Sequence, residues 1–397
     1  MIAESPELAA VEKGPAARML SIDVLRGFDM FWIAGGEELV HGLDKAAAMS
    51  GAGPGADGAA VHHNPILQFF ATQLQHVAWE GFRFYDLIFP LFLFLIGVSI
   101  TFSLGRIVRE EGLAAAHRRV FKRFVIMFLL GVFYYGGFAN AWVEPDGSHG
   151  MRLVGVLQRL ALGYLFASLL FLHFRVRGMA VALGVVLVGY WALMSFVPAP
   201  GEPAVSFAPG HNLANYIDLH YLPGRMNDKV WDPEGLLSTI PAVGTALLGV
   251  FTGLFLKRKD LAPQRKAAVL AAAGVGMILL GHLWGLQFPI IKKIWTSSYV
   301  LVAGGWSCVL VAAFYLVVDI WKVRWWTPPF LWIGSNALAV YMACRLFDFE
   351  ELAERFVGAG LPLQLGAYHP LLIACTAVAC VVAFARWLYK HEIFIRI

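Results

Sequence analysis

Residues 74 to 97 read LQHVAWEGFRFYDLIFPLFLFLIG. The second half of this stretch is apolar and, continued to residue 104, is long enough to cross a bilayer as a helix, which takes about 20 apolar residues. His76 lies just ahead of the apolar segment, and Asp86 lies at its mouth, followed by Pro90. A titratable side chain beside hydrocarbon has an energetic cost, so both residues require a structural or a chemical reason.

The rest of the chain shares this apolar character. Of its 397 residues, 59% are hydrophobic and 15% are charged, whereas a soluble domain carries about 25% charged residues. The sequence therefore predicts an all-α, polytopic membrane bundle of about ten helices. We place the spans at 20–43, 84–104, 121–141, 153–173, 178–197, 236–256, 267–286, 298–318, 329–347 and 369–389.

Lys and Arg gather in alternate loops, at 106–123, 175–177, 257–266 and 322–324, and again near the C-terminus. The positive-inside rule places these loops and both termini in the cytoplasm. The predicted organisation is a cytoplasmic tail at 1–19 and a single transmembrane domain at 20–397. Outward loops are expected at 44–83, 142–152, 198–235, 287–297 and 348–368. The first 19 residues lack the apolar region and cleavage site of a signal peptide, so the first span is expected to serve as the targeting element.

His76 and Asp86 each have two readings. Histidine is the side chain whose ordinary pKa suits proton transfer near neutrality, but an interfacial histidine can also simply bind a loop carbonyl. Asp86 lies where a carboxylate orients an imidazole, and equally where a carboxylate caps a helix N-terminus. Spacing alone leaves both choices open.

Charges also lie inside the predicted spans. We expect Arg26 to pair with Asp23 and Asp29, one turn away on either side, and either to lock the helix end or to meet an anionic ligand from the cytoplasm. Arg159, with Gln158 beside it, is expected to bind a carboxylate or an anionic ligand, because a buried unpaired arginine is costly.

Other polar residues stand at the ends or in the middle of spans. Pro233 and Glu234 suit the start of a helix, and capping is the favoured role for Glu234. Lys292 and Lys293 are either interface anchors or contacts for a sugar or carboxylate. Asn336, in the middle of a span, is expected to form helix–helix hydrogen bonds.

Several function classes find no support. The four cysteines lie in apolar segments without CxxC spacing and are expected to be free thiols. We see no ligand set for a metal, no nucleotide-binding motif and no nucleophile elbow. Basic residues are confined to loops beside the membrane, which argues against nucleic acid.

Six blocks occur in a familiar order: SIDVLRG, HVAWEGFRFYDLIFPLFLFLIGVSI, LVGVLQRLALGY, WDPEGLLSTIPA, IKKIWTSSYV and PFLWIGSNALAVY. They resemble the transmembrane acetyltransferase family typified by heparan-α-glucosaminide N-acetyltransferase, with its bacterial relatives. The resemblance runs from about Arg18 to the end of the chain.

This resemblance implies transfer of an acetyl group from cytoplasmic acetyl-CoA to an amino sugar or glycan on the far side of the membrane. It makes His76 the active-site histidine, as general base or acetyl carrier, and Asp86 its partner. One departure is the GGEE run around Glu37, where the family has an asparagine. The expected acceptor contacts are Trp79, Glu37, Glu234, Lys292 and Lys293, and the expected acetyl-CoA contacts are Arg26, Arg159 and Gln158.

The resemblance further implies a multi-pass protein of the bacterial inner membrane and, by family precedent, a homodimer, with no metal. Two alternative functions belong to classes other than enzymes. A transporter of a sugar or small anion would also explain many spans with charges inside them, but it leaves the histidine unexplained. A non-catalytic scaffold is disfavoured, because each polar residue within a span needs a partner.

Overall fold

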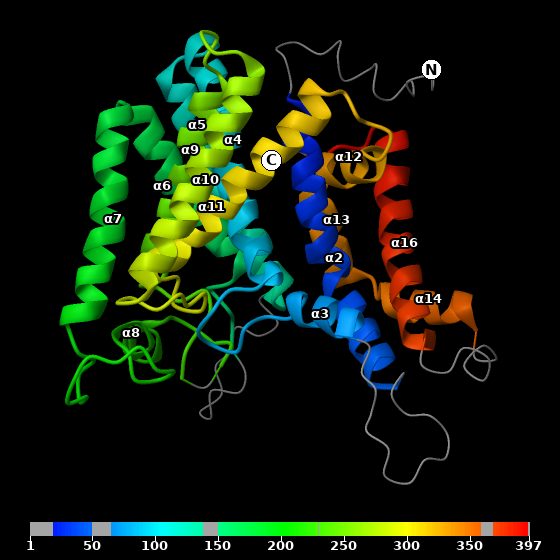
Figure 1. The fold of residues 1–397 in the computed structure, drawn as a ribbon, viewed down its shortest axis with the longest axis horizontal. Helices are drawn as coiled ribbons and strands as arrows, with labels where there is room; N and C mark the ends of the chain where they lie inside the picture. The colour runs from blue at the N-terminus through cyan, green and yellow to red at the C-terminus, as the bar shows by residue number, and fades with distance from the viewer. Residues whose placement is uncertain (1–18, 50–64, 138–149, 229, 359–367, 396–397) are drawn as a thin grey trace.

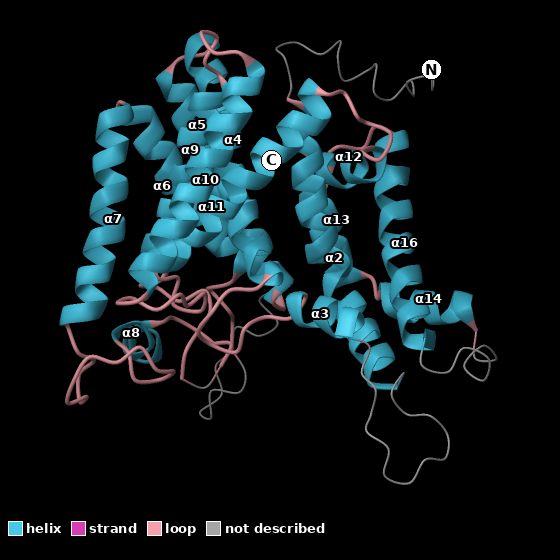
Figure 2. Cartoon of the chain, viewed as in Figure 1, coloured by secondary structure: helices cyan, strands magenta, loops and turns pink. Residues whose placement is uncertain are grey.

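The computed structural model describes residues 19–49, 65–137, 150–228, 230–358 and 368–395. Within these ranges the chain consists of helices and loops, with two isolated β-bridges and no strand, so the all-α prediction is confirmed (Figure 2). The first helices are α2 (Leu20–Met49), α3 (Pro65–Gln73), α4 (Phe84–Glu110), α5 (Leu113–Tyr134), α6 (Val156–His173), α7 (Val176–Phe196) and α8 (Leu213–Tyr221). They are followed by α9 (Thr239–Leu256), α10 (Pro263–Gly285), α11 (Ser297–Phe314), the π-helical turn η2 (Tyr315–Ile320), α12 (Pro328–Ser335), α13 (Ala337–Leu346), α14 (Phe349–Val357) and α16 (His369–Lys390).

The long helices form two groups that stand side by side (Figure 1). The larger group contains α4 to α7 and α9 to α11, and its closest pairs are α10 with α11 and α4 with α9. The smaller group is built around α2, which packs against α16 and α12. Because α2 also contacts α4 and α11, it joins the two groups.

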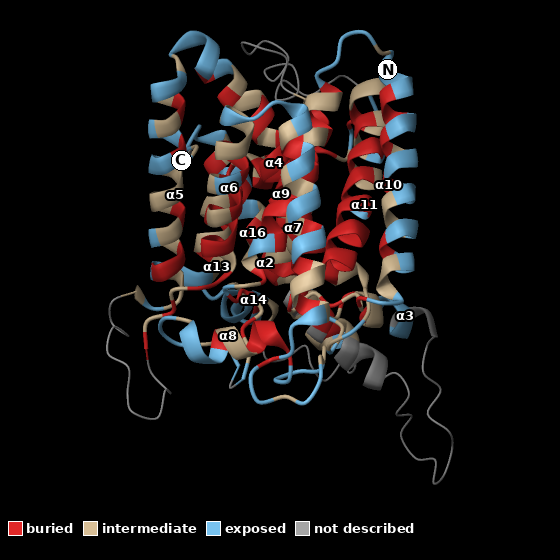
Figure 3. Cartoon of the chain, turned by 90° about the vertical axis from the view of Figure 1, so that its left-hand side faces the viewer, coloured by how far each residue is buried: buried red, intermediate tan, exposed pale blue. Residues whose placement is uncertain are grey.

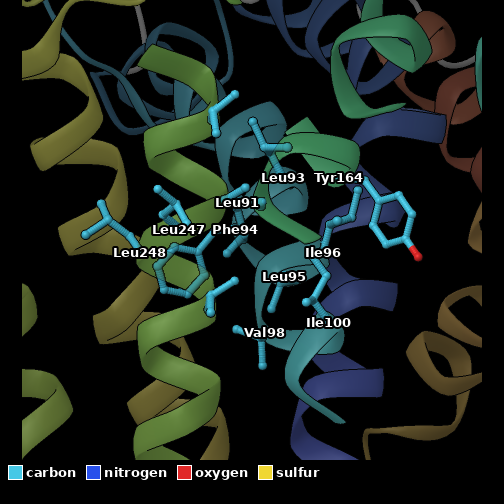
Figure 4. Packing of buried hydrophobic residues seen from close by; sticks show 14 of the residues in the cluster. Leu91, Leu93, Phe94, Leu95, Ile96, Val98, Ile100, Tyr164, Leu247 and Leu248 are labelled. Atoms are coloured by element: carbon cyan, nitrogen blue, oxygen red, sulfur yellow. The ribbon is translucent and has the colours of Figure 1, made fainter. Parts of the chain in front are cut away.

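The core of the larger group is centred on α4, whose Leu91, Leu93 and Phe94 are fully buried (Figure 4). Glycines let α4 and α9 approach each other closely. A Cβ on Gly97 would lie 1.9 Å from the carbonyl oxygen of Ala246, and one on Gly249 would lie 1.9 Å from that of Phe94. Close approach through small residues is how helices gain packing energy in a membrane, where the hydrophobic effect does not hold them together. Outer helices such as α7 and α10 bury few of their residues, about 22% of the apolar stretch in each (Figure 3).

Seven elements in the described part of the chain are long and apolar enough to cross a membrane: α4, α6, α7, α9, α10, α11 continued by η2, and α16. The other three predicted spans correspond to α2, α5 and the pair α12 and α13. The single helix predicted at 329–347 is wrong, because the backbone breaks at Asn336. The Asn336 side chain accepts a hydrogen bond from the Ile395 amide (3.2 Å), a tail residue rather than a neighbouring span. The total of ten spans stays a prediction.

The two ends of the bundle differ in charge. One end, here called the basic end, carries the connections α4–α5, α6–α7 and α9–α10 (Figure 1). The opposite end, here called the histidine end, carries α3, α8 and α14 and the loops 74–83, 197–212 and 286–296. The predicted outward segments therefore contain short helices, and α2 extends to Met49; residues 142–149 lie outside the described residues. Which end faces the cytoplasm stays a prediction.

Candidate active site

Two loops meet at the histidine end and create the site. The loop after α3 is pinned to the loop before α11 by a β-bridge between Glu80 and Ile291, and by the Gly81 amide donating to the Ile290 carbonyl (2.8 Å). Gly81 has φ +123°, a conformation that glycine adopts without strain. This pairing places His76 of one loop beside Lys292 of the other.

His76, Asp86 and Lys292 form a compact cluster, here called the exposed triad. His76 Nδ1 lies 2.8 Å from Asp86 Oδ1, and Lys292 Nζ lies 3.4 Å from the same oxygen and 3.1 Å from Nδ1. The Asp86 side chain is 2% exposed, whereas that of His76 is 51% exposed. Asp86 therefore holds the imidazole on its buried side, and the other side of the ring is exposed to solvent.

The carboxylate decides which nitrogen of His76 carries the proton. An ionised carboxylate only accepts hydrogen bonds, so a 2.8 Å contact requires Nδ1 to be the donor. Lys292 then donates to Asp86 rather than to Nδ1. The lone pair of Nε2 is left on the exposed side, and no described residue hydrogen-bonds to it. This is the tautomer that a general base or nucleophile requires.

Asp86 has both of the roles that spacing left open. While Oδ1 accepts from His76, Oδ2 accepts from the backbone amides of Val77 and Arg83, each at 3.2 Å. Because Arg83 is the N-cap of α4, Asp86 caps its own helix and orients the imidazole. Tyr299 of α11 also donates to the Asp86 carbonyl (2.8 Å), which fixes the start of α4 against α11.

The loop residues of the exposed triad have shifted pKa values. Burial against the protein lowers the pKa of His76, the hydrogen bond to Asp86 opposes this shift, and the charges of Lys292 and Lys293 add to it. Burial also lowers the pKa of Lys292, against the attraction of Asp86. The imidazole is therefore neutral, and able to accept a proton, over a wider pH range than an ordinary histidine.

Lys293 and Trp79, two of the predicted acceptor contacts, lie on an aromatic wall beside the triad. Lys293 Nζ lies 4.4 Å from the ring centroid of Trp231, and the rings of Trp231 and Trp79 meet edge to face at 5.7 Å. The Trp79 indole donates to the Phe207 carbonyl (2.8 Å). Trp79 thereby holds the 197–212 loop against the site, and Lys293 faces Trp231.

A second charged cluster, here called the buried cluster, lies deeper at the same end. Arg152 NH2 binds Asp232 Oδ1 and Glu234 Oε2, both at 3.0 Å, and the side chains of Arg152 and Asp232 are at most 2% exposed. The capping role favoured for Glu234 is wrong, because α9 begins five residues later at Thr239 and Glu234 pairs with Arg152 instead. Burial raises the pKa of Glu234, and the charge of Arg159 opposes this shift.

Arg159 does not bind a carboxylate directly, so the first of its two expected partners is wrong, while an anionic ligand stays a prediction. Its NH2 group donates to the Gly235 carbonyl (3.2 Å) and to the Ser238 hydroxyl, and its guanidinium lies 4.9 Å from the ring centroid of Trp295. Two of the nearby carboxylates, Asp232 and Glu234, already bind Arg152. Neighbouring Gln158 is 1% exposed, and neither atom of its amide has a hydrogen-bond partner among the described residues.

Arg26 lies at the basic end, far from the exposed triad. It pairs with Asp23 at 3.1 Å and donates to the Ser99 hydroxyl of α4 at 2.6 Å. Asp29 does not pair with Arg26 and is fully buried, with no described hydrogen-bond partner. Arg123 of α5, which sequence reasoning did not single out, is a charged neighbour of Arg26 and lies over the Tyr164 ring (4.7 Å).

Three further predictions concern Glu37, the cysteines and a metal site. The side chain of Glu37 lies outside the described residues. The four cysteines are free, as predicted. Among the described residues, no group of three His, Cys, Asp or Glu side chains is arranged to hold a metal ion.

Sequence reasoning missed Arg152, Asp232, Trp295 and Tyr299. Asp232 belongs to the DPEG block, two residues before Glu234, and Trp295 lies two residues after Lys293, so both are close in sequence to predicted site residues. The pairing of Arg152 with Asp232 joins residues 80 positions apart, which no local spacing reveals.

Comparison with known proteins agrees with these motifs. The family model described as heparan-alpha-glucosaminide N-acetyltransferase, catalytic, matches residues 59–283. The human protein named heparan-alpha-glucosaminide N-acetyltransferase is 27% identical over 329 residues, covering 69% of this chain and 49% of its own length. The mouse protein of the same name is 27% identical over 378 residues, covering 81% and 56%. The chain thus spans about half the length of the curated relatives it matches.

Proposed function

The chain belongs to the heparan-α-glucosaminide N-acetyltransferase family, and from this premise we propose that it is a membrane acetyltransferase. It moves an acetyl group from acetyl-CoA, bound at the basic end, to the amine of a sugar or glycan at the histidine end. The observation that carries the proposal is the exposed triad, in which Asp86 presents the free lone pair of His76 at the end opposite the basic loops. We further expect the protein in a bacterial cytoplasmic membrane, with the basic end inside, as a homodimer.

The basic end fits the phosphates of acetyl-CoA. Arg26 remains partly accessible, with 24% of its side chain exposed, and Arg123 lies close to it. Arginine suits phosphate because its planar fork donates two parallel hydrogen bonds. Ser99, which binds Arg26, and Asp86 are 13 residues apart on α4, about 20 Å along the helix axis. The pantetheine arm has to bridge this length to bring the thioester to His76.

Two routes are open for the chemistry at His76. In direct transfer, the nitrogen of the acceptor amine attacks the thioester carbonyl while Nε2 of His76 takes a proton from that amine. The C–S bond then breaks and the CoA thiolate leaves. In the covalent route, Nε2 attacks the carbonyl itself, the CoA thiolate leaves, and the amine then displaces the acetyl group from the imidazole. Both routes give an acetamide and CoA, and in both Asp86 stabilises the positive charge that forms on the ring.

The deciding experiment supplies labelled acetyl-CoA to sealed membrane vesicles with the basic end outward. Acetyl transfer predicts a labelled glycan or amino sugar in the lumen, and His76→Ala should abolish this labelling. His220→Ala, which removes an exposed histidine of α8 at the same end, is the matched control. Wild-type labelling by His76→Ala would overturn the proposal, and so would uptake of an unmodified sugar or anion with no consumption of acetyl-CoA, which is the transporter outcome.

A further inference from the structure

A groove of about 780 Å³ runs along one side of α6 and is not used by the chemistry above. Apolar side chains line most of the groove, and they include Leu162, Phe166 and Leu170 of α6 and Ile240 of α9. Arg159 and His173 both line it, and 14 residues of helix, about 21 Å, separate them. The groove therefore covers most of the roughly 30 Å of hydrocarbon in a bilayer.

The groove opens sideways. α6 and α7 each pack against α9 but stand apart from one another below the turn that links them (Figures 1 and 3). Phe166 and Ile240, both on the groove, are 47% and 46% exposed. Since these helices face lipid, a membrane lipid can enter without leaving the bilayer.

The connection between α6 and α7 bounds the groove at the basic end. α6 ends at His173 and α7 begins at Val176, so that Phe174 and Arg175 alone connect them. Phe174 lines the groove and leans on Gly178, where a Cβ would lie 2.9 Å from its ring. The amides of a pantetheine arm would find few hydrogen-bond partners along the apolar walls, so the cosubstrate is a poor occupant of the groove.

The other end of the groove is polar and unsatisfied. Arg159 and Gln158 are each 1% exposed, yet within the described part of the chain Nε and NH1 of Arg159 and both amide atoms of Gln158 have no hydrogen-bond partner. Buried polar atoms of this kind are costly unless a ligand supplies the bond. The three donors and one acceptor match sugar hydroxyls, which both donate and accept. Arg152 and Arg159 face three carboxylates, those of Asp232, Glu234 and Asp218, so the arginines carry no excess positive charge to attract an anionic head group.

One tight turn connects this polar end to the exposed triad. Lys292 contacts His76, and three residues later the Trp295 ring lies under the Arg159 guanidinium. The Trp295 amide donates to the Lys292 carbonyl (3.0 Å), and Trp295 adopts φ +51°, a strained conformation for a bulky residue. A hydrogen bond from its indole to Thr245 (3.1 Å) helps to hold it there. The same turn therefore contacts Arg159 through Trp295 and His76 through Lys292.

We propose that the groove binds the alkyl chain of a glycolipid, and that Arg159 and Gln158 bind the hydroxyls of its amino-sugar head. Resting on the proposed function, this makes the acetyl acceptor a lipid-anchored amino sugar rather than a free glycan.

The kinetic test compares two acceptors, methyl and dodecyl β-glucosaminide, with protein in lipid nanodiscs. The KM of the dodecyl glycoside should be at least tenfold lower. Leu162→Trp and Ile240→Trp fill the groove from opposite walls and should each remove this difference. Val185→Trp, at a position on α7 that is 66% exposed and does not line the groove, should keep it. Equal KM values for the two glycosides in the wild type would overturn the proposal. So would groove-filling variants that raise the KM for acetyl-CoA and leave the acceptor ratio unchanged, because the groove would then be the cosubstrate's path.

A second measurement does not depend on turnover. A dodecyl glucosaminide with a diazirine in its chain, photolysed in the nanodisc, should label residues 162–170 and 239–243, and Leu162→Trp should prevent this labelling. Labelling spread evenly over the outer faces of α7 and α10 would contradict the proposal. If the groove is labelled but neither glycoside is acetylated, the proposed function fails and the lipid site stands.

Discussion

The exposed triad and the buried cluster lie at the same end of the molecule and are built from the same kinds of side chain. In the buried cluster, Arg152 binds two carboxylates at 3.0 Å with almost no exposure. In the exposed triad, Asp86 is equally buried, but its partner His76 keeps half of its side chain open to the outside. The first arrangement pairs its opposite charges with each other and hides them from solvent, although Nε and NH1 of Arg152 have no hydrogen-bond partner among the described residues. The second leaves one basic nitrogen of His76 exposed for an external partner.

This difference separates structural from chemical roles. Removing one member of a buried ion pair leaves an uncompensated charge, so its cost falls on folding. Removing a half-exposed imidazole leaves a buried carboxylate that still accepts from two backbone amides and from Lys292. The cost there should fall on turnover. Substitutions in the two clusters should therefore separate loss of stability from loss of turnover.

The largest effect is expected for His76→Ala. Loss of the group that accepts the proton should lower kcat by about 10²- to 10⁴-fold. The melting temperature of the purified protein should stay close to that of the wild type, because the imidazole is half-exposed and Asp86 keeps its other partners. Labelled acetyl-CoA gives the rate and a thermal unfolding scan gives the stability. A variant that loses activity only in proportion to lost folded protein would place His76 with the structural residues.

Arg152→Met should produce the opposite pattern. Because Asp232 and Glu234 are then buried without their common partner, the free energy of unfolding should fall by about 3–5 kcal/mol. We expect little monodisperse protein after solubilisation. Arg355→Met, which breaks an exposed pair with Glu351 on α14, is the control and should behave as the wild type. Full stability of Arg152→Met would show that the buried cluster is not structural.

Much of the fold could be predicted from sequence, because long apolar runs have few solutions in a bilayer. A helix lies at each of the ten predicted spans, although α12 and α13 divide the ninth. That break could not be foreseen from the apolar run, and the hydrogen bond that Asn336 accepts there comes from Ile395, 59 positions away. The short helices α3, α8 and α14 were also missed, because at nine residues each they are too short to register as spans.

The site was predictable to the extent that its residues are neighbours in sequence. His76 and Asp86 are ten residues apart and do meet. Lys292 was named as a candidate, but its contact with His76 joins residues 216 positions apart and could be known only from the fold. The capping role favoured for Glu234 was wrong for the same reason, because a cap is inferred from neighbouring residues, whereas its partner Arg152 is 82 positions away.

Asp86→Asn should have a smaller effect than loss of His76. An amide at this position keeps the size of the side chain but removes the charge that fixes the Nδ1 proton and stabilises the charged ring. Loss of a charge-assisted hydrogen bond of about 1.5–3 kcal/mol predicts a fall in kcat of about 10- to 100-fold. The cap of α4 weakens as well, so a modest loss of stability is expected with the loss of rate. Unchanged kcat with lower stability would make Asp86 a helix cap alone.

The smallest effect should appear in the pH dependence of kcat/KM, which reports the pKa of the base in the free enzyme. Because the neutral imidazole is the active form, the rate should fall as the pH drops through the pKa of His76. Burial lowers this pKa, and the positive charges of Lys292 and Lys293 lower it further. Lys292→Met removes a neighbouring cation, favours the imidazolium, and should therefore move the acid limb to higher pH. Lys293→Met should move it in the same direction but less, because Lys293 lies over Trp231 while Lys292 touches the ring. An acid limb that stays in place in both variants would mean that the group titrating in the rate is not His76.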